Sequence, residues 1–231
     1  MNDILLEDPP CRVKVSVNRR ARRFTLRLNA EGEAILTVPP GIPGGEIRGF
    51  LHRHSDWLAK AIAKQPRKIL IEHGAELPVD GTLCTVRITD GRRKAPFLDG
   101  TELVLTGAGQ SGARVAAWLK LRARDRLQPA ARTYARKLGR RINAISLRDT
   151  TSRWGSCSSR GNLSFSWRLA MAPVEIQDYV AAHEAAHLVE MNHSDRYWAA
   201  LASIMPDYAE RRAWLKREGR GLHAYRFETD S

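Results

Sequence analysis

The sequence predicts an α+β protein whose two halves differ in character. In the first hundred residues, short runs alternate between apolar and polar side chains, as Val13, Val15 and Val17 do, which is typical of half-buried strands. After Gly112, apolar residues recur instead at helical spacing. We therefore expect an N-terminal antiparallel β-rich part with one helix, followed by a helical core that carries a β-hairpin.

The N-terminal elements follow from apolar runs that Gly, Pro and Asp-Gly pairs interrupt. The one helix is expected over residues 46–64, where apolar side chains such as Phe50, Leu51, Trp57 and Leu58 recur at helical intervals. Short strands are expected at residues 13–17, 24–28, 35–38, 69–71, 83–88 and 103–105.

A segment of small residues from Gly107 to Gly112 is the best candidate for an internal boundary. It divides the chain into a β-rich supporting region, residues 1–110, and a C-terminal core, residues 111–231. A chain of 231 residues can bury a sizeable core as one domain or as two small ones, so both arrangements stay open.

The first helix of the C-terminal part is predicted to be strongly basic. The formal net charge is +13, and eleven Lys and Arg residues lie between Arg114 and Arg148, with Asp125 as the one acid. Apolar residues at helical spacing in this stretch predict an amphipathic helix that bends near Pro129. Its basic face is either solvated or a binding surface for a polyanion such as nucleic acid.

Composition narrows the class of protein. The sequence has no run of eighteen apolar residues, so we expect no membrane span. Its three cysteines, Cys11, Cys84 and Cys157, are widely spaced and odd in number, which argues against a disulfide scaffold. Together with an acidic N-terminus that lacks a signal-peptide pattern, they favour a cytoplasmic protein.

The segment His183-Glu184-Ala185-Ala186-His187 carries the strongest chemical signal in the sequence. On a helix, His183 and His187 point the same way, and two imidazoles on one face can bind a single Zn²⁺. Glu184 then lies beside the metal, where a carboxylate can deprotonate a water molecule. Glu190 is expected to orient a ligating His by accepting its other N–H.

A third ligand is expected from the residues that follow. His193 comes six residues after His187 and is preferred, because a break in the helix is expected between them. Asn192 suits the left-handed conformation that ends a helix, and Ser194 suits the N-cap of the next one. Glu210 is the rival ligand on a later helix. Three protein ligands and one open position are typical of a catalytic zinc.

A hairpin is expected immediately before the metal-binding helix. Residues 151–158 lead into a turn at 159–162, and alternating residues from Leu163 to Trp167 then predict a half-buried strand. An exposed strand edge beside a metal can pair with an extended substrate, although the hairpin could equally be structural. Arg153, Trp154 and Ser156 are the candidate substrate-binding residues. Cys157 is read as a small core residue.

Several of these segments resemble the YgjP-like metallopeptidase family. The most specific are Arg-Trp-Gly-Ser-Cys-Ser at 153–158 and the His-Glu-Ala-Ala-His motif with Asn192, His193, Ser194 and Trp198. The opening strand at 19–28 and the helix after Pro39-Pro40 are also similar. The resemblance covers most of the chain, but residues 68–112 carry little of it.

The resemblance implies a zincin-type core in which His183, His187 and His193 bind one zinc ion and Glu184 is the general base. It relates the chain to the minigluzincins and to the SprT-like, DNA-associated metalloproteases. The leading expectation is zinc-dependent hydrolysis of a peptide or protein substrate. Because a member of the family is described as a UTP pyrophosphatase, nucleotide hydrolysis is the first alternative. A DNA-associated protease or a non-catalytic, polyanion-binding zinc protein is the second.

Overall fold

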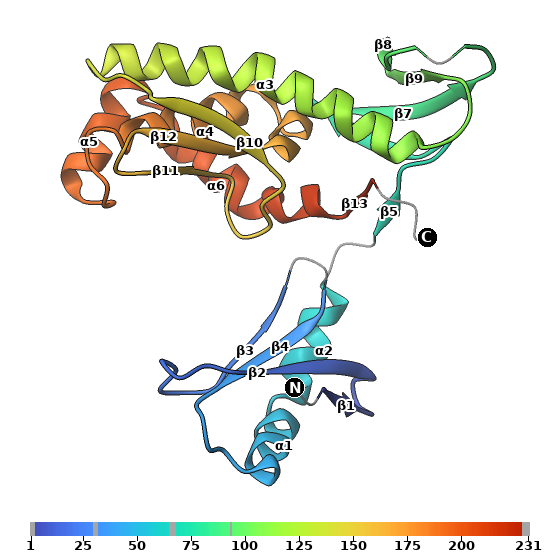
Figure 1. Ribbon diagram of the computed structural model, residues 1–231, viewed down its shortest axis with the longest axis vertical. Coiled ribbons are helices and arrows are strands. Elements are labelled where there is room, and N and C mark those ends of the chain that lie inside the picture. Colours follow the sequence, from blue (N-terminus) through green and yellow to red (C-terminus); the bar gives the residue numbers. More distant parts are fainter. Residues whose placement is uncertain (1–2, 30–31, 65–67, 93, 228–231) are drawn as a thin grey trace. The chain divides into compact units, whose positions relative to one another are not determined.

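The computed structural model describes residues 3–29, 32–64, 68–92 and 94–227, and it has the mixed helix and strand content of an α+β fold (Figure 1). The chain forms two compact units, Met1–Arg67 and Lys68–Ser231. Each unit has its own apolar core. The predicted fold class is therefore confirmed.

The first unit is a four-stranded sheet with two helices. Its strands run in the order β1-β2-β4-β3, and the central pair, β2 and β4, is parallel. The expected sheet was antiparallel throughout, but β3 and β4 form a hairpin, which leaves the far edge of β4 for β2. The elements are β1 (Ile4–Leu6), β2 (Cys11–Val17), β3 (Thr25–Leu28), β4 (Ala34–Val38), α1 (Gly44–Arg53) and α2 (Ser55–Ala63).

Two helices replace the single helix expected over residues 46–64, because the chain breaks at His54. The ring Nδ1 of His54 contacts the Phe50 carbonyl oxygen at 2.8 Å, while the His54 backbone N–H donates to the carbonyl of Leu51. The His54 ring thus occupies the Phe50 carbonyl, which the His54 backbone N–H would use as its acceptor if the helix continued. Leu51 and Leu58, one from each helix, are both fully buried in the core of this unit.

The second unit begins with a four-stranded sheet in the order β6-β7-β9-β8. Leu77, Val86 and Leu105 of this sheet share one core with Val115 and Leu119 of the following helix. The boundary expected at 107–112 therefore falls inside the second unit, and the compact units divide at residues 67 and 68. The strands of this sheet are β6 (Glu76–Val79), β7 (Thr82–Thr89), β8 (Phe97–Asp99) and β9 (Glu102–Thr106). The preceding strand, β5 (Ile69–Leu70), pairs instead with β13 (Tyr225–Arg226) in parallel.

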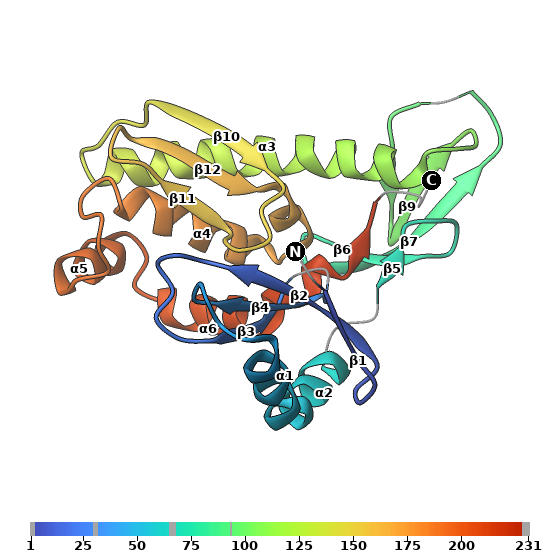
Figure 2. The ribbon, with the colours of Figure 1, turned by 60° about the horizontal axis from the view of Figure 1, so that its bottom comes forward.

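The basic helix, α3 (Ser111–Lys137), runs along the second unit and continues through Pro129 (Figure 2). The helix ends at Lys137, whereas the basic stretch expected to be helical continues to Arg148. Gly139 has a φ of +65°, and the Arg140 N–H reaches back to the Ala135 carbonyl, so a Schellman motif ends the helix. Residues from Ala144 to Arg148 form a strand, β10. A stripe of α3 is buried, comprising Val115, Leu119, Ala123, Leu127 and Ala131.

The predicted hairpin is present as β11 (Gly155–Cys157) paired antiparallel with β12 (Asn162–Ser166). Strand β10 joins the other side of β12 in parallel, so the sheet has the order β10-β12-β11. Strand β11 therefore lies at a sheet edge. The chain continues through η1 (Trp167–Met171), α4 (Val174–Ala186), α5 (Asp195–Ile204), α6 (Tyr208–Glu218), η2 (Gly219–His223) and β13 (Tyr225–Arg226).

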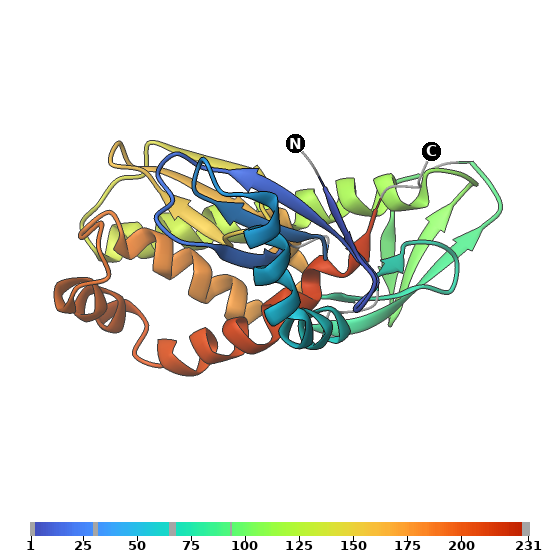
Figure 3. The same ribbon diagram turned by 90° about the horizontal axis from the view of Figure 1, so that it is seen from below.

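Helix α4 is the centre of the second unit. It packs on α3 on one side and contacts β11, α5 and α6 on others (Figure 3). Its four alanines at 181, 182, 185 and 186 are fully buried, so neighbouring elements approach its backbone closely. None of the helices in the described part of the chain is long and apolar enough to cross a membrane.

Candidate metal centre

Three histidines converge where α4 ends. One nitrogen from each of His183, His187 and His193 lies within 4.8 Å of the others, and the Nε2 atoms of His183 and His193 are 3.3 Å apart. Tetrahedral ligands at zinc–nitrogen distances of about 2.0–2.1 Å lie about 3.3–3.4 Å from one another. The distance between His183 and His193 is therefore that of two ligands of one zinc ion, and the nitrogen of His187 lies within 4.8 Å of both. Glu210, the rival third ligand, is not part of this group.

The chain reaches His193 by a tightened helix end. The N–H groups of Leu188 and Val189 donate to carbonyls three residues back, and His187 keeps a helical φ of −64°. The left-handed residue expected at Asn192 is not found, since the described non-glycine residues with positive φ are Asp80 and Gln110. The tightened turn makes such a residue unnecessary. Ser194 lies at the N-cap of α5, as expected.

Hydrogen bonds fix the orientation of two of the rings. Nδ1 of His183 lies 2.6 Å from Tyr197 Oη, whose hydroxyl donates to the His183 carbonyl at 3.2 Å. The hydroxyl oxygen therefore accepts from Nδ1–H, and Nε2 keeps its lone pair for a metal. His187 Nδ1 is held in the same way by the carbonyl of Glu190, at 3.1 Å.

Glu190 contacts the His187 ring through a different group from the one expected. Its backbone carbonyl accepts the hydrogen bond from His187, while its carboxylate Oε1 lies 3.5 Å from the Asn192 backbone nitrogen. Tyr197 was not anticipated at all as a functional residue. The sequence feature that could have identified Tyr197 is the N-cap at Ser194, because it places Tyr197 in the first turn of α5, close to His193.

Replacing Tyr197 by Phe should weaken zinc binding, activity or both by about 10–100-fold, the usual cost of losing a group that orients a metal ligand. Zinc affinity, measured by competition with a chromophoric chelator, checks this. Tyr208→Phe is the matched control, because Tyr208 stacks on Trp198 and its hydroxyl bonds to none of the three histidines. Equal zinc affinity and activity in Tyr197→Phe and wild type would contradict the assigned role.

Glu184 is a buried carboxylate that follows His183 on α4. Its side chain is only 4% exposed, and burial raises its pKa to about 8, an effect that the charge of Arg153 partly opposes. Its Oε2 atom is buried and finds no hydrogen-bond partner among the described residues. A buried polar atom of this kind is suited to accept a proton or a hydrogen bond from a ligand.

Burial favours the neutral form of His183 and His187. Burial lowers the pKa of His183 to about 3, and the neighbouring His187 and His193 add to this effect. The pKa of His187 is also lowered, chiefly by burial. Neutral imidazoles are the form that binds metal. The donor set, the nitrogen spacing and the unpartnered Glu184 oxygen thus all fit a zinc ion.

Gly155, on the edge strand β11, is what allows Glu184 to approach the sheet. A Cβ atom at residue 155 would overlap the Glu184 carboxylate, with Cγ at 2.6 Å and Cδ at 2.7 Å. Contacts this short do not occur between real side chains, so the carboxylate would have to move. Gly155 is therefore a positioning residue that the hairpin pattern did not identify.

Gly155→Ala should retain zinc but reduce turnover by roughly a hundredfold, the effect of displacing a catalytic group by about 1 Å. Steady-state rates and zinc content, measured on the same preparation, check this. Gly221→Ala is the matched control, because a Cβ there meets no atom within 4 Å. Full activity in Gly155→Ala would show that Glu184 need not stay in place.

The three candidate substrate-binding residues of the hairpin line two cavities, and Arg153 contributes to both. Arg153 lies near Glu184, and Trp154 stacks on His223 with ring centroids 4.8 Å apart. Ser156 follows Gly155, so its side chain points to the opposite face of the sheet. Ser156 lines a cavity of about 520 Å³, to which Arg153 and Gly155 also contribute. Cys157 behaves as an inert thiol, because burial and then Glu184 raise its pKa to about 11.

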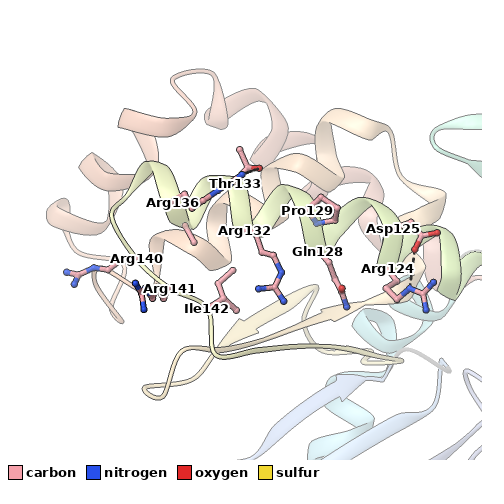
Figure 4. Close-up of a pocket in the computed structure, with 11 residues that line it drawn as sticks. Arg124, Asp125, Gln128, Pro129, Arg132, Thr133, Arg136, Arg140, Arg141 and Ile142 are labelled. Carbon is pink, nitrogen blue, oxygen red and sulfur yellow. Dashed lines mark hydrogen bonds and ion pairs between the residues drawn. The ribbon is translucent and has the colours of Figure 1, made fainter.

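The basic surface of α3 forms a groove of its own, with a volume of about 750 Å³ (Figure 4). Arg124, Gln128 and Arg132 follow one another along a single face of the helix, with Asp125 paired to Arg124. None of the metal-centre residues lines it. Five arginines contribute to this groove: Arg124, Arg132, Arg136, Arg140 and Arg141.

Comparison with known protein families identifies one match. The family model described as YgjP-like, metallopeptidase domain, matches residues 22–218, which is most of the chain and includes the whole three-histidine cluster. No match was found among curated proteins or solved structures.

Proposed function

Because the chain belongs to the YgjP-like family, whose model describes a metallopeptidase domain, we propose that it is a zinc-dependent peptidase. The observation that carries the proposal is the convergence of three imidazole nitrogens, from His183, His187 and His193, on a helix end that also carries the buried carboxylate of Glu184. Three nitrogen ligands leave the fourth position of a tetrahedral zinc for water or substrate.

Zinc bound by these histidines would polarise the scissile carbonyl and lower the pKa of water. Glu184 takes the proton from the attacking water and passes it to the leaving amine. Proton transfer of this kind needs a carboxylate that is buried yet not tied up by other hydrogen bonds, and the Oε2 atom of Glu184 has no partner among the described residues. Tyr197 and the Glu190 carbonyl keep the imidazoles of His183 and His187 in the ligating tautomer.

The edge strand β11 provides the means of holding an extended peptide. Ser156 pairs with Ser164, and the Ser166 N–H donates to the Trp154 carbonyl, so even-numbered residues of this strand bond to β12. In an antiparallel ladder the alternate residues direct their N–H and C=O groups away from the partner. Gly155 and Cys157 therefore offer these groups to a substrate strand.

Two other activities, nucleotide hydrolysis and peptide hydrolysis stimulated by nucleic acid, are the alternatives. Nucleotide hydrolysis is less favoured, because phosphoryl-transfer sites usually hold Mg²⁺ or Mn²⁺ through carboxylates, whereas this centre is built from imidazoles. The arginine-lined groove on α3 could bind a polyanion, so stimulation by nucleic acid is the second candidate.

Purified protein should therefore be assayed against casein and against UTP, each with and without a chelator and with and without single-stranded DNA. We expect cleavage of casein that the chelator abolishes and added zinc restores. Hydrolysis of UTP without cleavage of casein would overturn the proposal. An increase in casein cleavage with DNA, lost at high salt, would assign the α3 groove to nucleic acid.

A further inference from the structure

A second cavity, of about 450 Å³, adjoins the metal centre and is lined by positive charge. Four cations from three segments contribute to it. Arg153 precedes β11, Arg212 and Lys216 lie one helical turn apart on α6, and Arg220 belongs to η2. We call these four residues and the cavity between them the anion pocket.

The four cations of the anion pocket form no ion pair with the described residues, although the charge of Arg153 acts on the nearby Glu184 carboxyl. No Asp or Glu among the described residues lines the pocket. Other arginines of α6 differ in this respect. Arg211 pairs with Asp207 at 2.6 Å and Arg217 with Glu218 at 2.7 Å. Along α6, the cations that face the cavity are thus the unpaired ones.

The pocket is directly connected to the metal ligands. Tyr179, which lines it, places its Oη 3.4 Å from Nδ1 of His183. Arg212 lies over the Trp198 ring, 4.8 Å from the centroid, and that ring stacks on His193 at 5.6 Å. A group bound in the pocket therefore lies beside the bond that the metal centre would act on.

Its walls give the pocket a defined shape. Trp154 is stacked on His223, and a Cβ at Gly219 would come within 3.1 Å of the indole nitrogen of Trp154, so the ring is closely packed. Leu215 supplies an apolar wall from α6. Guanidinium groups on such a wall can bind carboxylate or phosphate oxygens in pairs.

We propose that the anion pocket binds an acidic group of the substrate close to the cleaved bond, and so makes the enzyme selective for anionic sequences. This inference rests on the proposed peptidase function. The shared chemistry is that of an oxyanion, supplied either by an Asp or Glu side chain or by a phosphorylated residue. Because Arg153 and Trp154 lead directly into Gly155, a peptide paired with β11 passes the pocket.

The test uses fluorogenic peptides that are identical except at one position near the cleaved bond, which carries Glu, Gln or phosphoserine. That position is moved along both sides of the bond in turn. For wild-type enzyme loaded with zinc, we expect kcat/KM to be about 10–100-fold higher for the anionic peptide than for Gln, the effect of one or two charge-assisted hydrogen bonds. The preference should shrink in high salt.

The double variant Lys216→Gln/Arg220→Gln should bring the ratio of Glu to Gln peptide close to one. Arg217→Gln is the matched control, because Arg217 lies on the same helix but pairs with Glu218 and does not line the pocket. Its ratio should equal that of wild type. A phosphoserine peptide preferred over the Glu peptide would identify phosphate as the natural oxyanion.

Binding measured without turnover separates the pocket from the catalytic proposal. The same peptides are titrated into zinc-loaded Glu184→Gln protein, with and without the pocket double substitution. Equal cleavage and equal binding of Glu and Gln peptides would overturn the anion pocket while the peptidase stands. Preferential binding of anionic peptides, with no cleavage of any by wild type, would leave the pocket supported and overturn the peptidase.

Discussion

Replacing Glu184 by Gln should lower peptide hydrolysis by about 10²–10⁴-fold while the protein keeps its zinc, because general acid–base catalysis contributes on that order. Gln has nearly the same shape as Glu but cannot accept a proton from water at neutral pH. The three histidines proposed as ligands are untouched by this change. Initial rates on a peptide substrate and zinc content, determined on one preparation, measure the two effects separately.

Glu190→Gln is the matched control for this experiment. Glu190 holds His187 through its backbone carbonyl, so the change of side chain should leave both activity and zinc content near those of wild type. Wild-type turnover in Glu184→Gln would remove Glu184 from the mechanism. Loss of zinc in Glu184→Gln would instead make Glu184 part of the metal's binding set.

The sequence predicted well those features that depend on residues close together in the chain. The spacing of His183 and His187, the N-cap at Ser194 and the turn between β11 and β12 each depend on residues a few positions apart. Periodicity and capping rules act over that range. The family resemblance drawn from these same segments agrees with the match over residues 22–218.

The pairings that the sequence did not predict depend on contacts between distant residues. Strand β10 lies parallel to β12, and β2 lies parallel to β4, although neither pair is adjacent in the chain. Alternation of apolar residues identifies a strand but not its partner. The division between the compact units was placed too late for a similar reason, because small residues at 107–112 were visible but the common core of β6–β9 and α3 was not.

The contacts of the candidate metal centre that the sequence did not predict also join distant residues. The bond between Tyr197 and His183 joins residues 14 positions apart, and the approach of Gly155 to Glu184 joins two different layers. An aromatic residue on an apolar helix face and a glycine in a short strand have ordinary structural explanations. Only the packing of α5 and β11 against α4 gives these two residues a role in the metal centre.

His193→Ala should weaken zinc binding by more than the roughly 10–100-fold that the loss of an orienting partner costs, because it removes a ligand itself. His193 Nε2 lies 3.3 Å from His183 Nε2, within the spacing of a shared tetrahedral ion. Glu210 lies outside the group of potential ligands, so Glu210→Ala should bind zinc as wild type does. Peptidase activity should follow zinc content in all three proteins.

Elemental analysis of wild type, His193→Ala and Glu210→Ala, purified in parallel, is therefore the most direct test of the three-histidine centre. We expect one zinc per chain in wild type and in Glu210→Ala, and a large loss of zinc in His193→Ala. Retention of zinc by His193→Ala together with its loss from Glu210→Ala would contradict the centre described, and would make the carboxylate of Glu210 the third ligand.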